Sequence, residues 1–160
     1  MPATVDIVRV TGASGGPTST TITSINTRAN AYDTHSTADT TNPIQIPAAG
    51  SNYSYWVSTR LTCSVTPSGT INNLRWYTDG ANGFGTGVTC IGQEATSYVQ
   101  ATGTAGQTGT QLTTGNHAGL TGAPVDPFTF TSGSPKSLAG SLSNPTTLFT
   151  RTPSATRSSY

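Results

Sequence analysis

Two histidines and a few carboxylates are the side chains with which this chain could bind a metal or move a proton. His35 lies between Asp33 and Asp39, and together they offer nitrogen and oxygen ligands for a metal. A catalytic zinc site takes three protein ligands held by further hydrogen-bonding partners, whereas T-H-S-T-A-D-T-T has the composition of a solvated loop. His117 lies in a glycine-containing loop with Asp126 as its neighbouring acid. An exposed loop histidine is the simpler interpretation, so we predict no metal site and no histidine base.

One serine lies in a loop that could present a nucleophile. The stretch G-A-S-G-G-P at residues 12–17 resembles the nucleophile loop of trypsin-like serine proteases. In that family the histidine and the aspartate that activate the serine precede it in the chain. Only 13 residues precede Ser14, none of them is histidine, and Ala13 stands where the family has aspartate. We therefore predict that Ser14 has no hydrolase activity.

The remaining acids also lack a recognisable catalytic pattern. Asp79 and Asn82 offer oxygen ligands for calcium, but their spacing is not that of an EF-hand. Glu94 is the only glutamate of the chain, so a glycosidase with paired carboxylates would need aspartates from distant loops. The sequence predicts a protein that is not an enzyme and has no cofactor.

The two cysteines, Cys63 and Cys90, are too few for a four-ligand metal site. They could pair across neighbouring strands. In a reducing cytoplasm, free buried thiols are expected instead.

The densest apolar surface lies in residues 53–80. Apolar side chains alternate with polar ones over residues 53–66, which is the pattern of a strand with one buried face; they are Tyr53, Tyr55, Val57, Leu61, Cys63 and Val65. P-S-G-T at residues 67–70 supplies turn chemistry. Ile71, Leu74, Trp76 and Tyr77 then form a second apolar run. We predict a hairpin that forms the core, with Trp76 buried in it.

The composition is poor in charge and rich in hydroxyl groups. Apolar residues make up 32% of the chain and charged residues 8%, with a net charge of +1, against roughly 45% and 25% in typical globular domains. A nucleic-acid binder would present a basic face, and no window approaches a membrane span. The start of the chain lacks the pattern of a signal peptide. We therefore expect synthesis in a cytoplasm, with neither nucleic acid nor membrane as partner.

Short apolar runs separated by turn residues follow one another along the chain. The strands we predict cover residues 4–10, 53–66, 71–77, 88–91, 98–101, 127–131 and 137–142. Such a series predicts an all-β fold, an antiparallel β-sandwich or partly open barrel. We expect a single β domain over residues 1–142, with an N-terminal strand and loop over 1–50 and a central sandwich over 51–142. Residues 143–160 predict an extended C-terminal arm.

Three phrases resemble virion proteins of tailed bacteriophages: R-W-Y-T-D-G at residues 75–80, Y-V-Q-A-T-G-T-A-G-Q-T-G-T at 98–110, and S-P-K-S-L-A-G-S-L-S-N-P at 134–145. The resemblance runs from residue 52 to about 142. It implies a capsid decoration (cement) protein that binds and stabilises the capsid lattice. It also implies the major capsid protein or another virion protein as partner, a homo-oligomer such as a trimer, and a place in the virion after synthesis in the host cytoplasm.

A phage tail protein or an adhesin-type carbohydrate-binding module is the alternative. In that case Trp56, Trp76 and Tyr77 would stack on sugar rings. Buried tryptophans would favour a scaffold, whereas exposed and coplanar ones would favour a sugar platform.

The C-terminal arm holds the residues that we expect to make assembly contacts, namely Leu148, Phe149, Arg151, Arg157 and Tyr160. The arm has few apolar residues and cannot stabilise its own fold by burial, so a partner surface would order it through strand addition. Deleting residues 144–160 is then expected to leave the melting temperature nearly unchanged and to weaken particle binding or oligomerisation.

Overall fold

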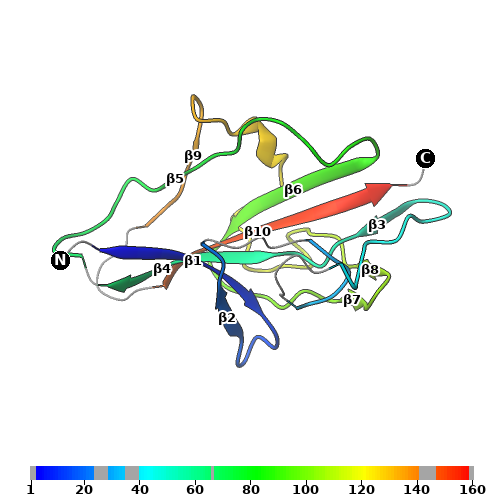
Figure 1. The fold of residues 1–160 in the computed structure, drawn as a ribbon, viewed down its shortest axis with the longest axis horizontal. Coiled ribbons are helices and arrows are strands. Elements are labelled where there is room, and N and C mark those ends of the chain that lie inside the picture. Colours follow the sequence, from blue (N-terminus) through cyan, green and yellow to red (C-terminus); the bar gives the residue numbers. More distant parts are fainter. Residues whose placement is uncertain (1–2, 24–28, 35–39, 66, 141–146, 159–160) are drawn as a thin grey trace.

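The computed structural model describes residues 3–23, 29–34, 40–65 and 67–140 and the backbone of residues 147–158. Short strands and long irregular connections make up this part of the chain (Figure 1). The elements are β1 (Thr4–Thr11), β2 (Thr18–Thr21), β3 (Ser51–Tyr53), β4 (Ser58–Val65), β5 (Arg75–Trp76), β6 (Val88–Ala95), β7 (Gly103–Thr104), β8 (Thr108–Gly109), the 3-10 helix η1 (Pro127–Thr129), β9 (Lys136–Ser137) and β10 (Thr147–Ser158). No α-helix occurs in the described ranges, and the predicted all-β class is confirmed.

One six-stranded antiparallel sheet organises the molecule. Its order is β2-β1-β4-β10-β3, and β6 pairs along the other edge of β10. Two small two-stranded sheets, β5-β9 and β7-β8, lie outside it. The β5-β9 ribbon and η1 pass over one face of the large sheet, while the β7-β8 ribbon lies on the opposite side (Figure 1).

The C-terminal residues depart most from the predicted architecture. Residues 147–158 form the 12-residue strand β10, which pairs with β4 and β3 on one edge and with β6 on the other. The expectation of an extended arm outside the β domain is therefore wrong for these residues. Leu148, Phe149, Arg151 and Arg157 lie in this strand, whereas Tyr160 lies outside the described residues. Their role in assembly contacts stays a prediction.

A proline in the middle of β10 hid this strand from sequence analysis, and the register explains how the sheet accommodates it. The N–H and C=O of Gly92 in β6 bond to Val125, at 2.9 and 3.0 Å, so they face away from β10. Pro153, the partner of Gly92, therefore occupies a non-hydrogen-bonded position, and its nitrogen faces away from β6. On that other edge the pairing with β4 ends at Arg151 and the pairing with β3 begins at Thr156. The missing N–H of Pro153 thus costs the ladder no bond.

This register predicts that a proline is tolerated at one position of β10 and harmful at the next. Thr152 is the partner of Gln93 at a hydrogen-bonded position of the β6 ladder. Thr152→Pro would leave the backbone oxygen of the buried Gln93 without its donor, at a cost of about 1–3 kcal/mol. Pro153→Ala should cost only about 0.4–1 kcal/mol, through the entropy of the unfolded chain. Urea unfolding of both variants checks this, and equal losses would contradict the register.

The connection between β3 and β4 leaves the sheet and builds the core. Residues 54–57 are all buried, and they lie opposite the part of β10 that neither strand pairs with. Tyr55 and Trp56 pack with Ala101 and Leu112 in the core cluster, against Ile91, Val99 and Leu120. The Trp56 indole N–H donates to the Val99 carbonyl at 2.9 Å. The break in alternation at Trp56 thus marks the point where the chain turns into the core.

The predicted hairpin over residues 53–80 is wrong. Its first strand, β4, pairs with β1 and β10, and its second, β5, pairs with β9. Trp76 is half-buried, so its predicted place in the core is also wrong. Local alternation identified β4, but it carries no information about which distant strand becomes the partner.

Some of the remaining strand predictions are confirmed and others are wrong. Those over residues 4–10 and 88–91 are confirmed by β1 and β6. No strand forms over residues 98–101, and η1 replaces the strand expected from residue 127 because Asp126 caps it. Of the strand expected over residues 137–142, only Ser137 lies in β9, and residues 141 and 142 lie outside the described part.

Candidate functional site

The face of the large sheet opposite the core lies under a flap, which we define as residues 71–87 and 126–140. Its two halves are tied together where Thr78 donates its N–H and its hydroxyl to the Phe130 carbonyl, at 2.8 and 3.1 Å. Its end is tied to the sheet where the Ala139 N–H donates to Oε1 of Glu94 in β6, at 3.1 Å. Glu94 therefore lies on the flap side of the sheet.

The strand register shows which residues of β10, β4 and β1 lie on the flap side of the sheet. Arg151 of β10 is the partner of Glu94 on one edge and of Thr59 on the other. Cross-strand partners share a face, and so do alternate residues along one strand. The apolar residues on the flap side of β4 and β1 are therefore Leu61, Cys63, Val5 and Ile7.

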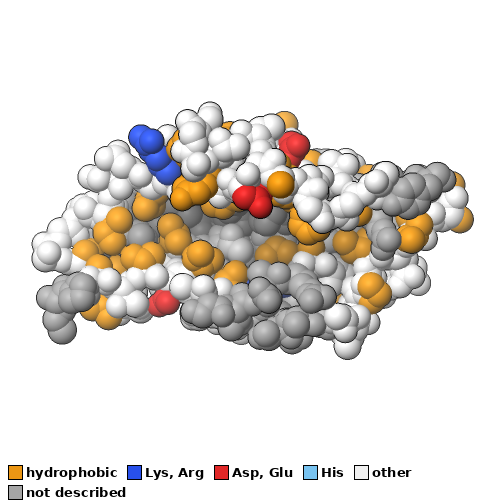
Figure 2. Space-filling model, turned by 45° about the horizontal axis from the view of Figure 1, so that its top comes forward, with side chains coloured by type: hydrophobic (Ala, Val, Ile, Leu, Met, Phe, Trp, Pro, Cys, Tyr) orange, Lys and Arg blue, Asp and Glu red, His pale blue; other side chains and the backbone are white. Residues whose placement is uncertain are grey.

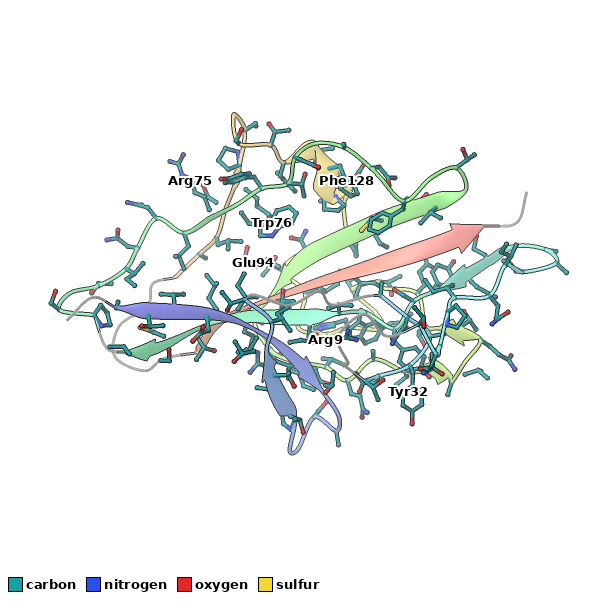
Figure 3. All side chains as sticks on the ribbon, in the orientation of Figure 1. Arg9, Tyr32, Arg75, Trp76, Glu94 and Phe128 are labelled. Carbon is teal, nitrogen blue, oxygen red and sulfur yellow. The ribbon has the colours of Figure 1, made fainter. Side chains whose placement is uncertain are left out.

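Aromatic rings line the flap. Trp76 meets Phe130 edge-on, with ring centroids 6.3 Å apart, and Lys136 Nζ lies 5.5 Å from the centroid of Phe130. Phe84 meets Phe128 in the same manner at 6.1 Å. Figure 3 shows Trp76 turned toward Glu94 and Arg75 turned away from the sheet. The flap thus faces the sheet with its largest apolar ring.

Flap and sheet leave an apolar hollow between them. Figure 2 shows hydrophobic side chains gathered along it. Cys63 is fully buried, but Ile7 is 41% exposed, and Val5, Leu61, Trp76 and Phe130 are only half-buried. We call the surface formed by Val5, Ile7, Leu61, Trp76 and Phe130 the apolar cleft. Apolar surface that a fold leaves open in one place is typical of a site for a partner, which makes the apolar cleft the candidate functional site.

The predicted chemical residues do not converge on this cleft. Ser14 accepts a hydrogen bond from the Gln100 N–H at 3.1 Å, in a network at the β1-β2 loop. Asp33 Oδ2 accepts from the Gly12 N–H at 2.9 Å and from the Gln100 side chain at 3.0 Å. The Tyr98 hydroxyl donates to the Gly12 carbonyl at 2.7 Å. This network fastens the loop of the β1-β2 hairpin onto residues 98–100.

Tyr98 shows how enclosed this network is. Burial raises the pKa of its phenol far above the usual range, the charge of Asp33 adds to the rise, and Arg60 and Arg9 oppose it. The guanidinium of Arg60 lies 5.8 Å from the centre of the Tyr98 ring. The phenol therefore stays protonated, as a donor in a structural bond.

Asp79 and Asn82, which the sequence offered as calcium ligands, close turns instead. Asp79 Oδ1 accepts from the Ala81 N–H at 3.0 Å, and Asn82 Oδ1 accepts from the Phe84 N–H at 3.2 Å. Asp126 Oδ1 caps η1 through the Phe128 N–H at 2.9 Å. His35 and Asp39 lie outside the described residues. Within the described part, no three His, Cys, Asp or Glu residues come together.

His117 is fully buried, so its expected exposure in a loop is wrong. Its ring lies 5.5 Å from the Trp56 ring, and neither ring nitrogen hydrogen-bonds to a described residue. Burial lowers the pKa of the imidazole, and the residue's own backbone opposes this in part. The ring is thus neutral in the fold and acts as a packing group.

The buried imidazole predicts a loss of stability in mild acid. In the unfolded chain His117 takes a proton near pH 6.5, whereas in the fold it does so only at lower pH. As the pH falls through about 6.5, the unfolded chain binds a proton that the folded chain does not yet bind. The free energy of unfolding should therefore fall as the pH drops. His117→Phe should remove this slope between pH 7 and 5 in urea titrations, and His35→Gln should keep it. A slope that survives His117→Phe would contradict the prediction.

The sugar platform of the alternative hypothesis does not form. Trp56 is in the core, 3% exposed, and Trp76 packs edge-on against Phe130. Tyr77 is 57% exposed and follows Trp76 in the chain, just past β5. With one tryptophan buried and the other half-buried, neither of the two expected outcomes is met in full.

Cys63 and Cys90 are both buried thiols that form no disulfide, in agreement with the second interpretation of the cysteines. In the described part of the chain, no helix has the length and apolar character that a membrane crossing needs. Comparisons with protein families, curated proteins and solved structures found no match.

Proposed function

We propose that this chain is a non-enzymatic structural protein of a phage virion, a capsid decoration protein that binds and stabilises the capsid lattice through its apolar cleft. The observation that supports this most is the open apolar surface between flap and sheet (Figure 2). A catalytic pocket needs convergent polar groups, whereas the described polar side chains close turns and fasten loops.

The low charge supports the same role. Only 8% of the residues are charged, so a partner that covers the surface strips water from few ions. Burial of apolar surface is then the main favourable contribution to docking. The sequence segments that resemble virion proteins are our reason for proposing the capsid as the partner surface.

Co-sedimentation with tailed-phage capsids that lack this protein tests the proposal. We expect the wild-type chain to pellet with the capsids at a saturating ratio. Ile7→Lys places a charge in the apolar cleft and should abolish binding. Ile46→Lys is the matched control, since Ile46 is 54% exposed and lies outside the cleft, so binding should persist.

Thermal unfolding of both variants ensures that the comparison concerns folded proteins. A wild-type chain that stays in the supernatant would overturn the proposal. Equal binding of Ile7→Lys and wild type would remove the apolar cleft as its docking surface.

A further inference from the structure

β10 is the only described strand that joins the two halves of the large sheet. β4 pairs with β1 on its outer edge, and β6 bridges to Val125 and Leu120 on its outer edge. Between them lies β10, which takes eight partner positions on β6 and a further set on β4 and β3. Without β10 the inner edges of β4 and β6 would face each other across a slot one strand wide, each with open backbone groups.

The strand that fills this slot is the last of the described elements. The bonds that hold β10 in the slot join backbone groups, so the β10 of another molecule can make the same bonds. The flap is fixed to its own sheet as far as Ala139, through the bond to Glu94. Seven residues, 140–146, then lead to β10, and they can span about 25 Å when extended.

We propose that copies of this chain exchange β10, so that the C-terminal strand of one copy completes the sheet of a second copy. The inference rests on the proposed function, because copies held on a lattice meet at a high effective concentration. A high effective concentration favours pairing of β10 with a second copy over pairing with its own sheet. The occupant of the slot is then a second copy of this chain, and strand exchange links neighbouring decoration proteins.

The register offers a chemical reporter for the exchange. Cys90 in β6 is the partner of Ala155. This pair has the same parity as Gly92 and Pro153 and is non-hydrogen-bonded, so its Cα atoms lie about 4.5 Å apart. That separation is within the range of a disulfide, about 4.4–6.8 Å.

The experiment uses two full-length chains that are co-expressed with different tags. The donor chain carries Ala155→Cys and Cys90→Ser, and the acceptor chain is wild type with its native Cys90. After mild oxidation, a disulfide that joins donor and acceptor is expected on a non-reducing gel.

Three matched controls identify the bond. An acceptor with Cys90→Ser should give no cross-link. A donor with Ser154→Cys in place of Ala155→Cys should give none either, since Ser154 is the partner of Ile91 and lies on the other face of the strand. A single chain with Ala155→Cys and native Cys90 reports the bond within one molecule.

The outcomes separate this inference from the proposed function. A donor–acceptor cross-link that depends on Cys90 supports exchange. An intramolecular disulfide in the single chain without any donor–acceptor cross-link overturns it, even where capsid binding persists. Failure of every disulfide overturns the register and the exchange with it. A Cys90-dependent cross-link in a protein that does not bind capsids would support strand exchange and contradict the proposed virion function.

Discussion

Trp56→Ala is expected to lower the free energy of unfolding by about 3–5 kcal/mol. The indole is 3% exposed and packs with Tyr55, Ala101 and Leu112. Truncation would leave a cavity there, and the Val99 carbonyl would lose the indole N–H that it accepts at 2.9 Å. The adjacent imidazole of His117 would also lose the ring against which it packs.

Trp76→Ala is the matched comparison, because the chain has two tryptophans and each variant keeps the other. Trp76 is half-buried under the flap, so its removal should cost only about 1 kcal/mol. Urea unfolding gives both energies. Iodide should quench the remaining indole readily in Trp56→Ala and poorly in Trp76→Ala. If Trp76→Ala cost more unfolding free energy than Trp56→Ala, Trp76 would be the core tryptophan, as the sequence analysis predicted.

Sequence analysis identified those parts of the sheet whose pattern is local. β1, β4 and β6 alternate apolar and polar residues or carry β-branched runs, and each lies within or overlaps a predicted strand. The partner of each strand is a different matter. β4 precedes β5 in the chain, yet it pairs with β1 and β10. Such pairings depend on contacts between residues far apart in sequence, which a local pattern does not record.

The sequence predicted one wall of the candidate site and not the other. Alternation placed Leu61 and Cys63 on one face of β4, and β1 was predicted as a strand, so the sheet wall of the apolar cleft was within reach of the sequence. The flap wall was not, because it depends on the long-range pairing of Arg75 with Ser137 and of Trp76 with Lys136.

Three of the polar residues that suggested chemistry have a common structural use. Asp79, Asn82 and Asp126 each accept a backbone N–H two residues ahead, which is the local bond that short polar side chains make in turns and caps. Two of the six acidic residues of the chain, Asp79 and Asp126, are used in this way. Spacing alone did not separate the two roles, since a turn and a ligand loop require the same residue types.

Deleting residues 144–160 is expected to abolish cooperative folding, which reverses the expectation from the sequence. The deletion removes β10 and its eight partner positions on β6 together with those on β4 and β3. Each hydrogen bond contributes about 0.5–1.5 kcal/mol net, and a domain of this kind has only about 5–15 kcal/mol in total. The loss also opens β6, whose residues Gln93, Glu94 and Ala95 are buried.

Circular dichroism in increasing urea measures this effect. The full-length chain should unfold in one cooperative transition, and the truncated chain should show a gradual change without a plateau. A synthetic peptide of residues 144–160, added in excess, should restore the transition because it can fill the slot between β4 and β6. A peptide with Thr152→Pro should restore it less well, since it lacks the N–H that Gln93 accepts. A truncated chain that melts at the full-length temperature would show that the sheet stands without β10, and the C-terminal residues would then be the arm that the sequence predicted.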